Sequence, residues 1–279
     1  MMYNIPTIVK WAGGKKQLLK QFEPLFPKKI DRYFDPFVGG GAVALYILKY
    51  RRPKEVYLSD INEELINCYI IVRDHVDQLI IELRGYKSRH NEKEYYRVRD
   101  DLDPRALPPI DRAARFIYLN KTCFNGLYRV NARGKFNVPI GNYKNPAICA
   151  DEDLKEASKL LQNAKINPKP TQFYDAVKDA GKGDFVYFDP PYYPLTTTSS
   201  FTSYTNDSFL DKEQEKLRGV FADLDKKKCN VMLSNSDTPY IEKLYENYKE
   251  HTIKVKATRM INCIAEKRGE INELVITNY

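Results

Sequence analysis

The sequence predicts an α/β protein built on a doubly wound β-sheet. Short runs of β-branched and aromatic residues are apolar nearly throughout instead of alternating, as in strands that are buried on both faces. Helical stretches follow these runs, and strand–helix alternation is typical of a doubly wound sheet. The chain has 279 residues, 43% of them hydrophobic, which suits one large domain carrying a smaller insertion.

Four of these runs are predicted to be parallel strands. They are Arg32–Phe34, Val56–Leu58, Phe185–Phe188 and Val231–Leu233. Three of them end in an acid, namely Asp35, Asp60 and Asp189. Ligands bind at the carboxyl ends of the strands in sheets of this kind. These acids are therefore the first candidates for a functional site.

Helices are predicted where apolar residues recur at helical spacing. Gly41–Leu48 and Asn62–Leu83 follow the first two strands, and residues 208–228 place Leu217, Val220, Phe221 and Leu224 on one face. The strand pattern resumes at Asn167–Phe173. In the tail, Thr252–Val255 and Leu274–Ile276 indicate two further strands, which could form an antiparallel hairpin at the sheet edge.

The strand pattern disappears in the middle of the chain. Residues 67–145 contain helical segments and a long loop, Lys121–Tyr143, which is rich in Asn, Arg, Lys and aromatic residues. We interpret this region as an insertion between two parts of one sheet. The predicted organisation is a core domain of residues 1–66 and 146–279 and an inserted, mainly helical domain of residues 67–145.

Composition narrows the class of protein. Lys and Arg exceed Asp and Glu by 45 to 37, and the net charge of +8 suits a polyanionic partner, although many enzymes are equally basic. The five cysteines form no CxxC or Cys/His cluster, so no metal site is expected. The N-terminus does not resemble an export signal, and no apolar run approaches the roughly 18 residues of a membrane span. We expect a cytoplasmic protein.

The first motif follows a predicted strand and opens a helix: Asp35-Pro36-Phe37-Val38-Gly39-Gly40-Gly41. Glycines let the backbone approach a ligand closely, and a helix N-terminus presents N–H groups. Asp60 follows at roughly the 20-residue offset at which a carboxylate binds ribose hydroxyls. The combination predicts a nucleotide-type cofactor, which could be a dinucleotide or S-adenosylmethionine.

A second glycine motif lies near the N-terminus: Lys10-Trp11-Ala12-Gly13-Gly14-Lys15. It is not a phosphate-binding P-loop, because the G-x-x-x-x-G-K-[ST] pattern is missing and Lys16 stands where Ser or Thr is needed. A lysine after a tight turn could instead pair with a ligand carboxylate. Trp11 beside it could equally belong to the core.

The most informative motif is Asp189-Pro190-Pro191-Tyr192, directly after an apolar strand. The exocyclic amine of adenine is a poor nucleophile, because its lone pair is delocalised into the ring. A carboxylate and a backbone carbonyl that accept its two hydrogens localise that lone pair. The prolines stiffen the turn that aims the Pro190 carbonyl, and Tyr192 could stack on a base swung out of the duplex. The motif predicts methylation of an amino group.

With these motifs in this order, the chain resembles the Dam-type, α-class DNA adenine-N6 methyltransferases over nearly its whole length. The resemblance includes Leu119–Lys121, Asn125–Asn131, Gly134, Phe136–Pro139, Phe201–Tyr204 and Leu233–Thr238. It implies a Rossmann-like S-adenosylmethionine-dependent methyltransferase sheet with residues 67–145 as the DNA target-recognition domain. The implied reaction is direct transfer of a methyl group from S-adenosylmethionine to adenine N6 of a flipped base in double-stranded DNA, without a metal.

The resemblance also assigns roles to single residues. Asp189, the Pro190 carbonyl and Tyr192 would hold the target base. Lys15 would bind the cofactor carboxylate and Asp60 the ribose hydroxyls. The implied cofactor pocket further contains Trp11, Asp35, Gly39, Gly40 and Asp189, with Phe173 or Tyr174 beside the cofactor adenine.

The loop Lys121–Tyr143 is the predicted DNA-reading loop. Arginine suits guanine and asparagine suits adenine in the major groove. Arg129 is the first candidate for reading a guanine, and Phe124 could fill the gap left by a flipped base. In the resemblance this loop belongs to enzymes that modify GATC, although some similar enzymes read longer sites and some have Arg where this chain has Asn142. The predicted DNA contacts are Phe124, Asn125, Leu127, Arg129, Asn131, Arg133, Lys135, Pro139 and Asn142.

Competing functions fit less of the sequence. Methyltransferases of cytosine N4 or RNA adenine commonly have Ser or Asn in place of Asp189. A DNA-binding protein without activity would not need Asp189, Asp60 and Lys15 intact, and a nicotinamide dehydrogenase leaves Asp-Pro-Pro-Tyr unexplained. Residues 196–204 could close over the target base or be an ordinary surface loop. We expect a monomer, associated with the nucleoid through DNA. Pairing with a restriction endonuclease and a solitary role both stay open.

Overall fold

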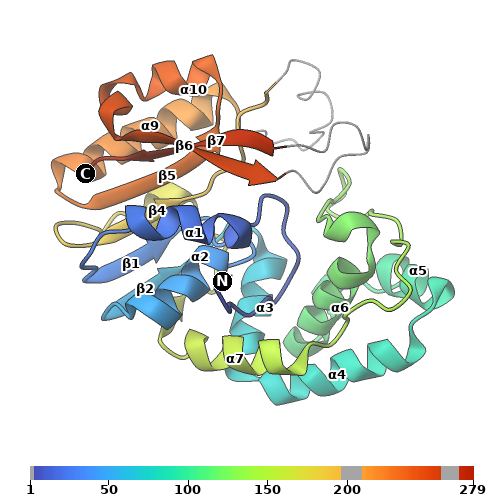
Figure 1. Ribbon diagram of the computed structural model, residues 1–279. Helices are drawn as coiled ribbons and strands as arrows, with labels where there is room; N and C mark the ends of the chain where they lie inside the picture. Colours follow the sequence, from blue (N-terminus) through green and yellow to red (C-terminus); the bar gives the residue numbers. More distant parts are fainter. Residues whose placement is uncertain (1–2, 196–208, 259–269) are drawn as a thin grey trace.

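The computed structural model describes residues 3–195, 209–258 and 270–279, and it confirms the α/β prediction (Figure 1). The described residues form one seven-stranded sheet in the order β3-β2-β1-β4-β5-β7-β6. β1 to β5 run parallel, and β7 is antiparallel to both of its neighbours. The strands are β1 (Arg32–Asp35), β2 (Glu55–Leu58), β3 (Ala164–Ile166), β4 (Phe185–Phe188), β5 (Asn230–Ser236), β6 (Thr252–Thr258) and β7 (Glu270–Thr277).

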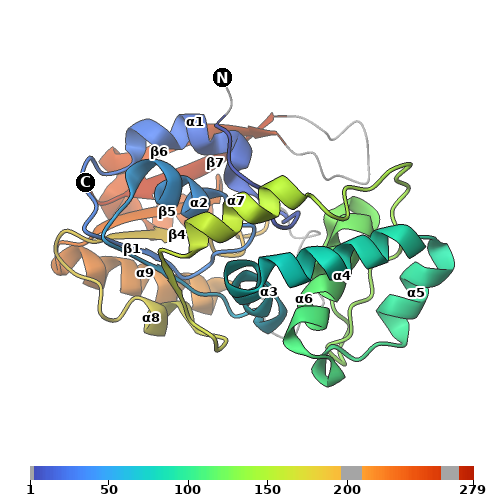
Figure 2. The same cartoon turned by 90° about the horizontal axis from the view of Figure 1, so that it is seen from below.

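Helices cover both faces of this sheet (Figures 1 and 2). Side chains alternate across a strand. In β4, Phe185 and Tyr187 enter one core while Val186 and Phe188 enter another. The first core includes side chains of α1, α2, α3 and α7, and the second those of α8, α9 and α10. Burial on both faces explains why the strand sequences are apolar nearly throughout.

The described α-helices range in length from four to 16 residues. The α-helices are α1 (Leu19–Phe22), α2 (Ala42–Tyr46), α3 (Glu63–Asp74), α4 (Val76–Arg89), α5 (Glu92–Asp100), α6 (Pro109–Thr122), α7 (Asp151–Leu161), α8 (Phe173–Ala176), α9 (Asp211–Lys226) and α10 (Pro239–Leu244). Short helical segments of other types are η1 (Lys15–Leu18), η2 (Glu23–Leu25), η3 (Ile47–Arg51), η4 (Pro104–Ala106), η5 (Phe124–Gly126) and η7 (Glu246–His251).

Two predicted elements need correction. The predicted helix Asn62–Leu83 is two helices, because His75 between α3 and α4 has φ −137° and ψ 35°, which is not helical. The predicted strand Asn167–Phe173 is wrong, since β3 ends at Ile166 and Phe173 begins α8. Two prolines in that stretch, Pro168 and Pro170, lack the N–H groups that a strand donates to its neighbour.

Helices α3 to α7 lie between β2 and β3 in the chain, where the insertion was predicted. α4, α5 and α6 stand beside the sheet, at the right of Figure 1. α3 contacts both β3 and α6 and so joins the two parts. The boundaries at residues 67 and 145 therefore stay a prediction. The tail strands β6 and β7 pair antiparallel, with β6 at the sheet edge, as predicted. Among the described helices, none is both long and apolar enough to cross a membrane.

Candidate active site

Three predicted acids meet at the carboxyl ends of neighbouring strands. β1 lies between β2 and β4; Asp35 ends β1, Asp60 follows β2 and Asp189 follows β4. The Gly39 N–H donates a hydrogen bond of 3.1 Å to Oδ2 of Asp60, and the Asn62 N–H donates one of 2.9 Å to Oδ1. The glycine loop and the second acid of the predicted cofactor site are thus in direct contact.

The loop between β1 and α2 needs its glycines. Gly39 and Gly41 have φ angles of 47° and 72°, in the left-handed region. A Cβ atom on Gly39 would lie 2.9 Å from Cδ1 of Trp11, and one on Gly41 would lie 2.2 Å from the Tyr69 hydroxyl. The structure therefore places the Trp11 indole directly against the glycine loop, so that the two N-terminal motifs form one surface.

Asp35 is buried beneath this loop, and both of its carboxylate oxygens already accept hydrogen bonds. The Tyr33 hydroxyl donates to Oδ2 at 2.9 Å and the Phe37 N–H donates to Oδ1 at 3.3 Å. Burial raises the pKa of Asp35 to about 7; the Tyr33 hydrogen bond opposes the increase and nearby Asp189 adds to it. Burial also raises the pKa of Asp60. The site thus brings together buried carboxyl groups. Their charged forms need a nearby cation or hydrogen-bond donor to offset the cost of burial.

Lys15 supplies a positive charge next to the carboxylate of Asp189. Nζ of Lys15 lies 2.8 Å from Oδ1 of Asp189, and it donates to the Gly13 carbonyl oxygen at 2.6 Å. The same Nζ is 4.8 Å from the centroid of the Tyr192 ring. Burial raises the pKa of Asp189, and Lys15 opposes the increase. Residues from two motifs far apart in the sequence therefore form one cluster.

Buried amides hold the turn that follows Asp189. Nε2 of Gln214, on α9, donates to the Pro191 carbonyl oxygen at 3.2 Å, and the Tyr193 N–H donates to Oδ1 of Asn235 at 3.2 Å. Nδ2 of Asn235 donates to Oε1 of Gln214 at 3.0 Å, which links the two amides. Both amide side chains are fully buried. Neither residue was predicted to belong to the site. Asn235 lies in Leu233–Thr238, a segment that contributes to the family resemblance, and Gln214 lies in no motif.

A further acid at this cluster, Glu273, was also missed. Its side chain is buried, and its Oε2 accepts a hydrogen bond of 2.7 Å from the Tyr192 hydroxyl. Glu273 pairs with Ser236 across β7 and β5. Because β7 is antiparallel, one of its first residues lies at the carboxyl end of β5. The only sequence signal is a single acid beside the apolar run Leu274–Ile276.

The two candidates for flanking the cofactor adenine differ in burial. Phe173 is buried and stacks on Phe37, with ring centroids 5.5 Å apart. Tyr174 is partly exposed, and Nζ of Lys216 lies 3.7 Å from its ring centroid. The segment before them is tied to the site, since the Thr171 N–H donates to the Asp60 carbonyl oxygen at 3.1 Å. Ile61, which the sequence reasoning overlooked, is 58% exposed directly after Asp60.

Most of the predicted DNA contacts lie on the surface. Asn125 and Leu127 are partly buried. The exposed ones are Phe124, Arg129, Asn131, Arg133, Lys135, Pro139 and Asn142. Residues Val130 and Phe136 form an antiparallel bridge, and Gly134 between them has a φ of 72°. The tip of the DNA-reading loop is therefore a small hairpin that presents its side chains outward.

Arg129 and Asn131, two of the predicted DNA contacts, also form hydrogen bonds within the loop. Nε of Arg129 donates to Oδ1 of Asn137 at 2.7 Å, and one terminal nitrogen donates to the Asn137 carbonyl oxygen at 3.2 Å. These bonds use two of the five N–H donors of the guanidinium. Oδ1 of Asn131 accepts hydrogen bonds from the N–H groups of Arg133 and Lys135 at 2.9 and 3.1 Å. Asn131 thus has a structural role in the hairpin.

The first two residues of the predicted loop, Lys121 and Thr122, belong to helix α6. α6 continues to Thr122, and Lys121 is buried on it; burial lowers the pKa of Lys121 to about 8. One residue earlier, the buried Asn120 accepts a hydrogen bond from the Lys10 N–H at 2.7 Å and donates to the Lys10 carbonyl oxygen at 2.8 Å. It also donates to the Gly126 carbonyl oxygen at 3.1 Å. One side chain therefore connects the N-terminal motif with the DNA-reading loop.

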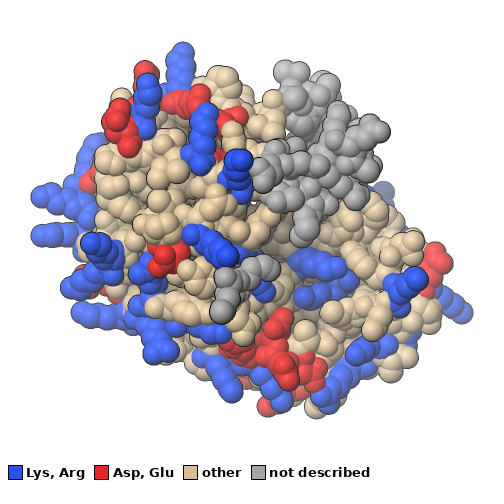
Figure 3. Space-filling view, in the orientation of Figure 1, with Lys and Arg blue, Asp and Glu red and all other residues tan. Residues whose placement is uncertain are grey.

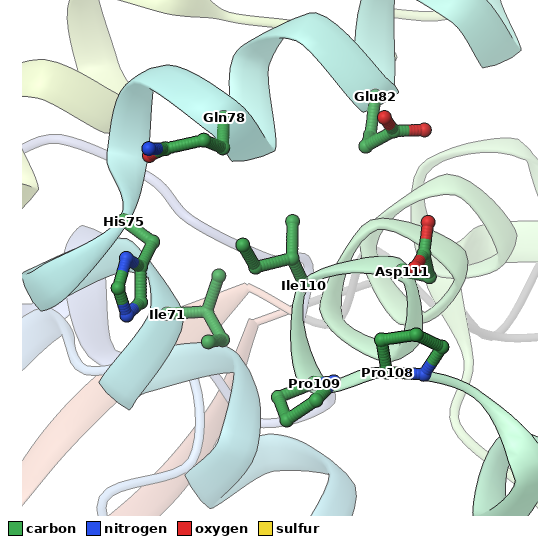
Figure 4. Close-up of a pocket in the computed structure, with 8 residues that line it drawn as sticks. All are labelled: Ile71, His75, Gln78, Glu82, Pro108, Pro109, Ile110 and Asp111. Atoms are coloured by element: carbon green, nitrogen blue, oxygen red, sulfur yellow. The ribbon is translucent and has the colours of Figure 1, made fainter.

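One predicted segment is outside the described residues, and one described cavity is separate from the predicted site residues. The predicted loop of residues 196–204, with Phe201–Tyr204, lies outside the described residues. A cavity of about 430 Å³ lies between α4 and the start of α6, and none of the predicted site residues lines it (Figure 4). Its lining is Ile71, His75, Gln78, Glu82, Pro108, Pro109, Ile110 and Asp111.

Comparison with known proteins points to one family. The family described as D12 class N6 adenine-specific DNA methyltransferase matches residues 11–261. The chain is 48% identical to the type II methyltransferase M.MjaIII of Methanocaldococcus jannaschii, over 99% of this chain and 100% of that protein. It is 45% identical to the type II methyltransferase M1.LlaDCHI of Lactococcus lactis subsp. cremoris, over 99% and 96%. It is 35% identical to the DNA adenine methylase of Escherichia coli, over 96% and 94%.

Proposed function

The chain belongs to the D12 class of N6 adenine-specific DNA methyltransferases, and on this premise we propose how it acts. It swings one adenine of GATC out of duplex DNA and methylates N6 with S-adenosylmethionine. The cluster of Lys15, Asp189 and Tyr192 carries this proposal. It combines a hydrogen-bond acceptor for the amine, an aromatic ring for the base and a cation that opposes protonation of the acid.

The residues around the glycine loop fit the methyl donor. S-adenosylmethionine carries a positive sulfonium and a positive ammonium group, and the site concentrates the carboxyl groups of Asp35, Asp60 and Asp189. Gly39 and Gly40 let the loop pack directly against Trp11, because a Cβ on either would come within about 3 Å of Trp11 atoms. We assign the ribose hydroxyls to Asp60, the cofactor carboxylate to Lys15 and the adenine ring to Phe173 or Tyr174, with Ile61 as a second apolar neighbour.

The proposed chemistry needs no covalent enzyme intermediate. When bound, S-adenosylmethionine supplies an electrophilic methyl group on its sulfonium. Asp189 and the Pro190 carbonyl accept the two N6 hydrogens, which directs the nitrogen lone pair at that methyl. The N–CH₃ bond forms as the S–CH₃ bond breaks, and the extra proton leaves N6 through the Asp189 carboxylate. Gln214 and Asn235 hold the turn in place, so Asp189 is oriented before the substrate arrives.

The DNA-reading loop supports a duplex substrate. Its exposed Arg129, Arg133 and Lys135 can meet base edges and phosphates. Figure 3 shows further Lys and Arg side chains on the same face, some of them in the hollow between the sheet and the helical part. Arg129 is our candidate for reading a guanine of GATC, because Asn137 fixes its orientation and leaves three N–H donors.

We also propose that the enzyme works in a pair with a restriction endonuclease. Both relatives named type II methyltransferases are more similar to this chain, at 48% and 45% identity, than the DNA adenine methylase of Escherichia coli, at 35%. Its product DNA should therefore resist an endonuclease of the same sequence specificity.

The decisive experiment is incubation of the purified chain with radiolabelled S-adenosylmethionine and plasmid DNA. The modified base is identified after digestion, and its flanking sequence is mapped. Label at adenine N6 within GATC supports the proposal. Label at N6 in another sequence would overturn GATC only, whereas label on cytosine would overturn the assigned chemistry. The matched control is the variant Asp189→Ala.

A further inference from the structure

We propose that Glu273 is a positioning residue that fixes the ring of Tyr192 where it must meet the target adenine. The inference rests on the proposed function, since stacking of Tyr192 on the flipped base is part of it. Glu273 does not touch the reacting atoms. It acts through the 2.7 Å hydrogen bond that its Oε2 accepts from the Tyr192 hydroxyl.

The Tyr192 side chain is held at both ends. A tyrosine ring turns about two bonds, and an anchored hydroxyl restricts both rotations. At the backbone end, Gln214 binds the Pro191 carbonyl oxygen and Asn235 binds the Tyr193 N–H. At the ring, Nζ of Lys15 is 4.8 Å from the centroid. Glu273 supplies the remaining anchor, at the distal end of the ring. A ring oriented before binding does not lose that freedom when the base arrives.

Stability alone does not account for Glu273. A buried carboxylate without a cation is costly, and in the described part of the chain no Lys, Arg or His forms an ion pair with Glu273. Its charge also contributes to the raised pKa of Asp189. Burial of Glu273 costs stability, and its charge opposes ionisation of Asp189, yet it accepts a hydrogen bond from Tyr192. We therefore expect Glu273 to serve activity.

The test is a double-mutant cycle on the single-turnover methylation rate at saturating S-adenosylmethionine. Glu273→Gln keeps the size of the side chain, and Tyr192→Phe removes only the hydroxyl. Tyr192→Phe is expected to slow transfer about tenfold or more, as loss of a hydrogen bond to a charged group does. Glu273→Gln is expected to slow transfer by less, because the amide oxygen can still accept a hydrogen bond but no longer carries a charge. The double variant should be no slower than Tyr192→Phe alone, because that substitution removes the contact that Glu273→Gln weakens. Glu250→Gln, which removes an exposed carboxylate from η7, is the control.

Thermal unfolding separates positioning from structural support. Glu273→Gln should unfold at the wild-type temperature or above it, while its methylation rate falls. A wild-type rate in Glu273→Gln, multiplicative losses in the double variant, or a loss of rate that follows a loss of thermal stability would each overturn the inference.

Base extrusion is measured independently with duplexes that carry 2-aminopurine at the target adenine. If the 2-aminopurine emission rises on binding to the wild type and rises less on binding to Glu273→Gln, the result supports both base extrusion and the positioning role of Glu273. If emission stays flat with the wild type while the rate cycle remains coupled, the proposed base extrusion fails. Glu273 then still positions Tyr192 for methyl transfer, but the stacking of Tyr192 on a flipped base is overturned.

Discussion

Lys15 and Asp189 form an ion pair beside the ring of Tyr192, with 2.8 Å between Nζ and Oδ1. The two residues come from motifs far apart in the sequence, and each has a separate proposed task. Lys15 is assigned to the carboxylate of the methyl donor and Asp189 to the amine of the acceptor. In this proposal Lys15 lies next to the binding sites of both the methyl donor and the target adenine. The ion pair is therefore the first place to test the chemistry.

Asp189→Ala is expected to abolish methyl transfer and to leave S-adenosylmethionine binding largely intact. The substitution removes the acceptor for an N6 hydrogen, whereas Asp60, Trp11 and the glycine loop remain. Transfer is measured with labelled cofactor, and binding by calorimetry. Asp179→Ala, at an exposed position, serves as the control. Substantial residual transfer by Asp189→Ala would contradict the mechanism.

Lys15→Met, at saturating cofactor, is expected to move the acidic limb of the pH–rate profile to higher pH. Asp189 accepts hydrogen bonds from the amine only as a carboxylate. Burial raises its pKa and Lys15 opposes the increase, so removal of Lys15 raises the pKa further. Lys20→Met, which removes an exposed lysine of α1, should keep the wild-type profile. Coincident limbs in all three proteins would exclude this role of Lys15.

The thermal stability of the protein is expected to fall as the pH rises from about 5 to about 7, and to fall less in Asp35→Asn. Burial raises the pKa of Asp35 from its ordinary value of 3.8 to about 7. Between these values the folded protein holds a proton that the unfolded chain has released, so the free energy of unfolding decreases with pH. Calorimetric unfolding of both proteins across this range is the measurement. Equal slopes would show that Asp35 does not titrate in this way.

Gly41→Ala is expected to lower the free energy of unfolding by about 1–3 kcal/mol or to prevent folding. The residue has a φ of 72°, and a Cβ would lie 2.2 Å from the Tyr69 hydroxyl. Gly181→Ala is the matched control, because its Cβ would meet nothing within 4 Å. Urea unfolding of both variants gives the comparison, and similar midpoints would argue against a strained loop at Gly41.

Arg129→Ala is expected to relax discrimination at one guanine, at a cost of about 1–3 kcal/mol. The measurement is kcat/KM on duplexes with each base of the site changed in turn. Asn137→Ala should show the same pattern in weaker form, because Asn137 orients the guanidinium. A uniform loss on every duplex would identify Arg129 as a phosphate contact.

Much of the fold and the centre of the site could be predicted because their signals are local. A strand buried on both faces is apolar along its length, and parallel strands deliver the acids after them to one edge. Asp35, Asp60 and Asp189 therefore lie at the carboxyl ends of neighbouring strands.

The supporting residues could not be predicted, since their partners depend on strand order and on packing between distant segments. Glu273 reaches Tyr192 only because β7 runs antiparallel beside β5. Tyr128 illustrates the same limit in the DNA-reading loop. Its ring stacks on Trp11 with 5.7 Å between centroids, and nothing in the loop sequence separates it from the exposed aromatic Phe124.

The hydrogen bonds of Asn120 have a consequence for protein engineering. Its side chain binds both backbone groups of Lys10 and the carbonyl oxygen of Gly126. A chimera that grafts the corresponding hairpin of a relative should therefore be joined beyond this contact, within residues 129–135. A graft that also replaces Asn120 would loosen the segment that carries Trp11 and Lys15, so a change of target sequence would come with weaker binding of the methyl donor.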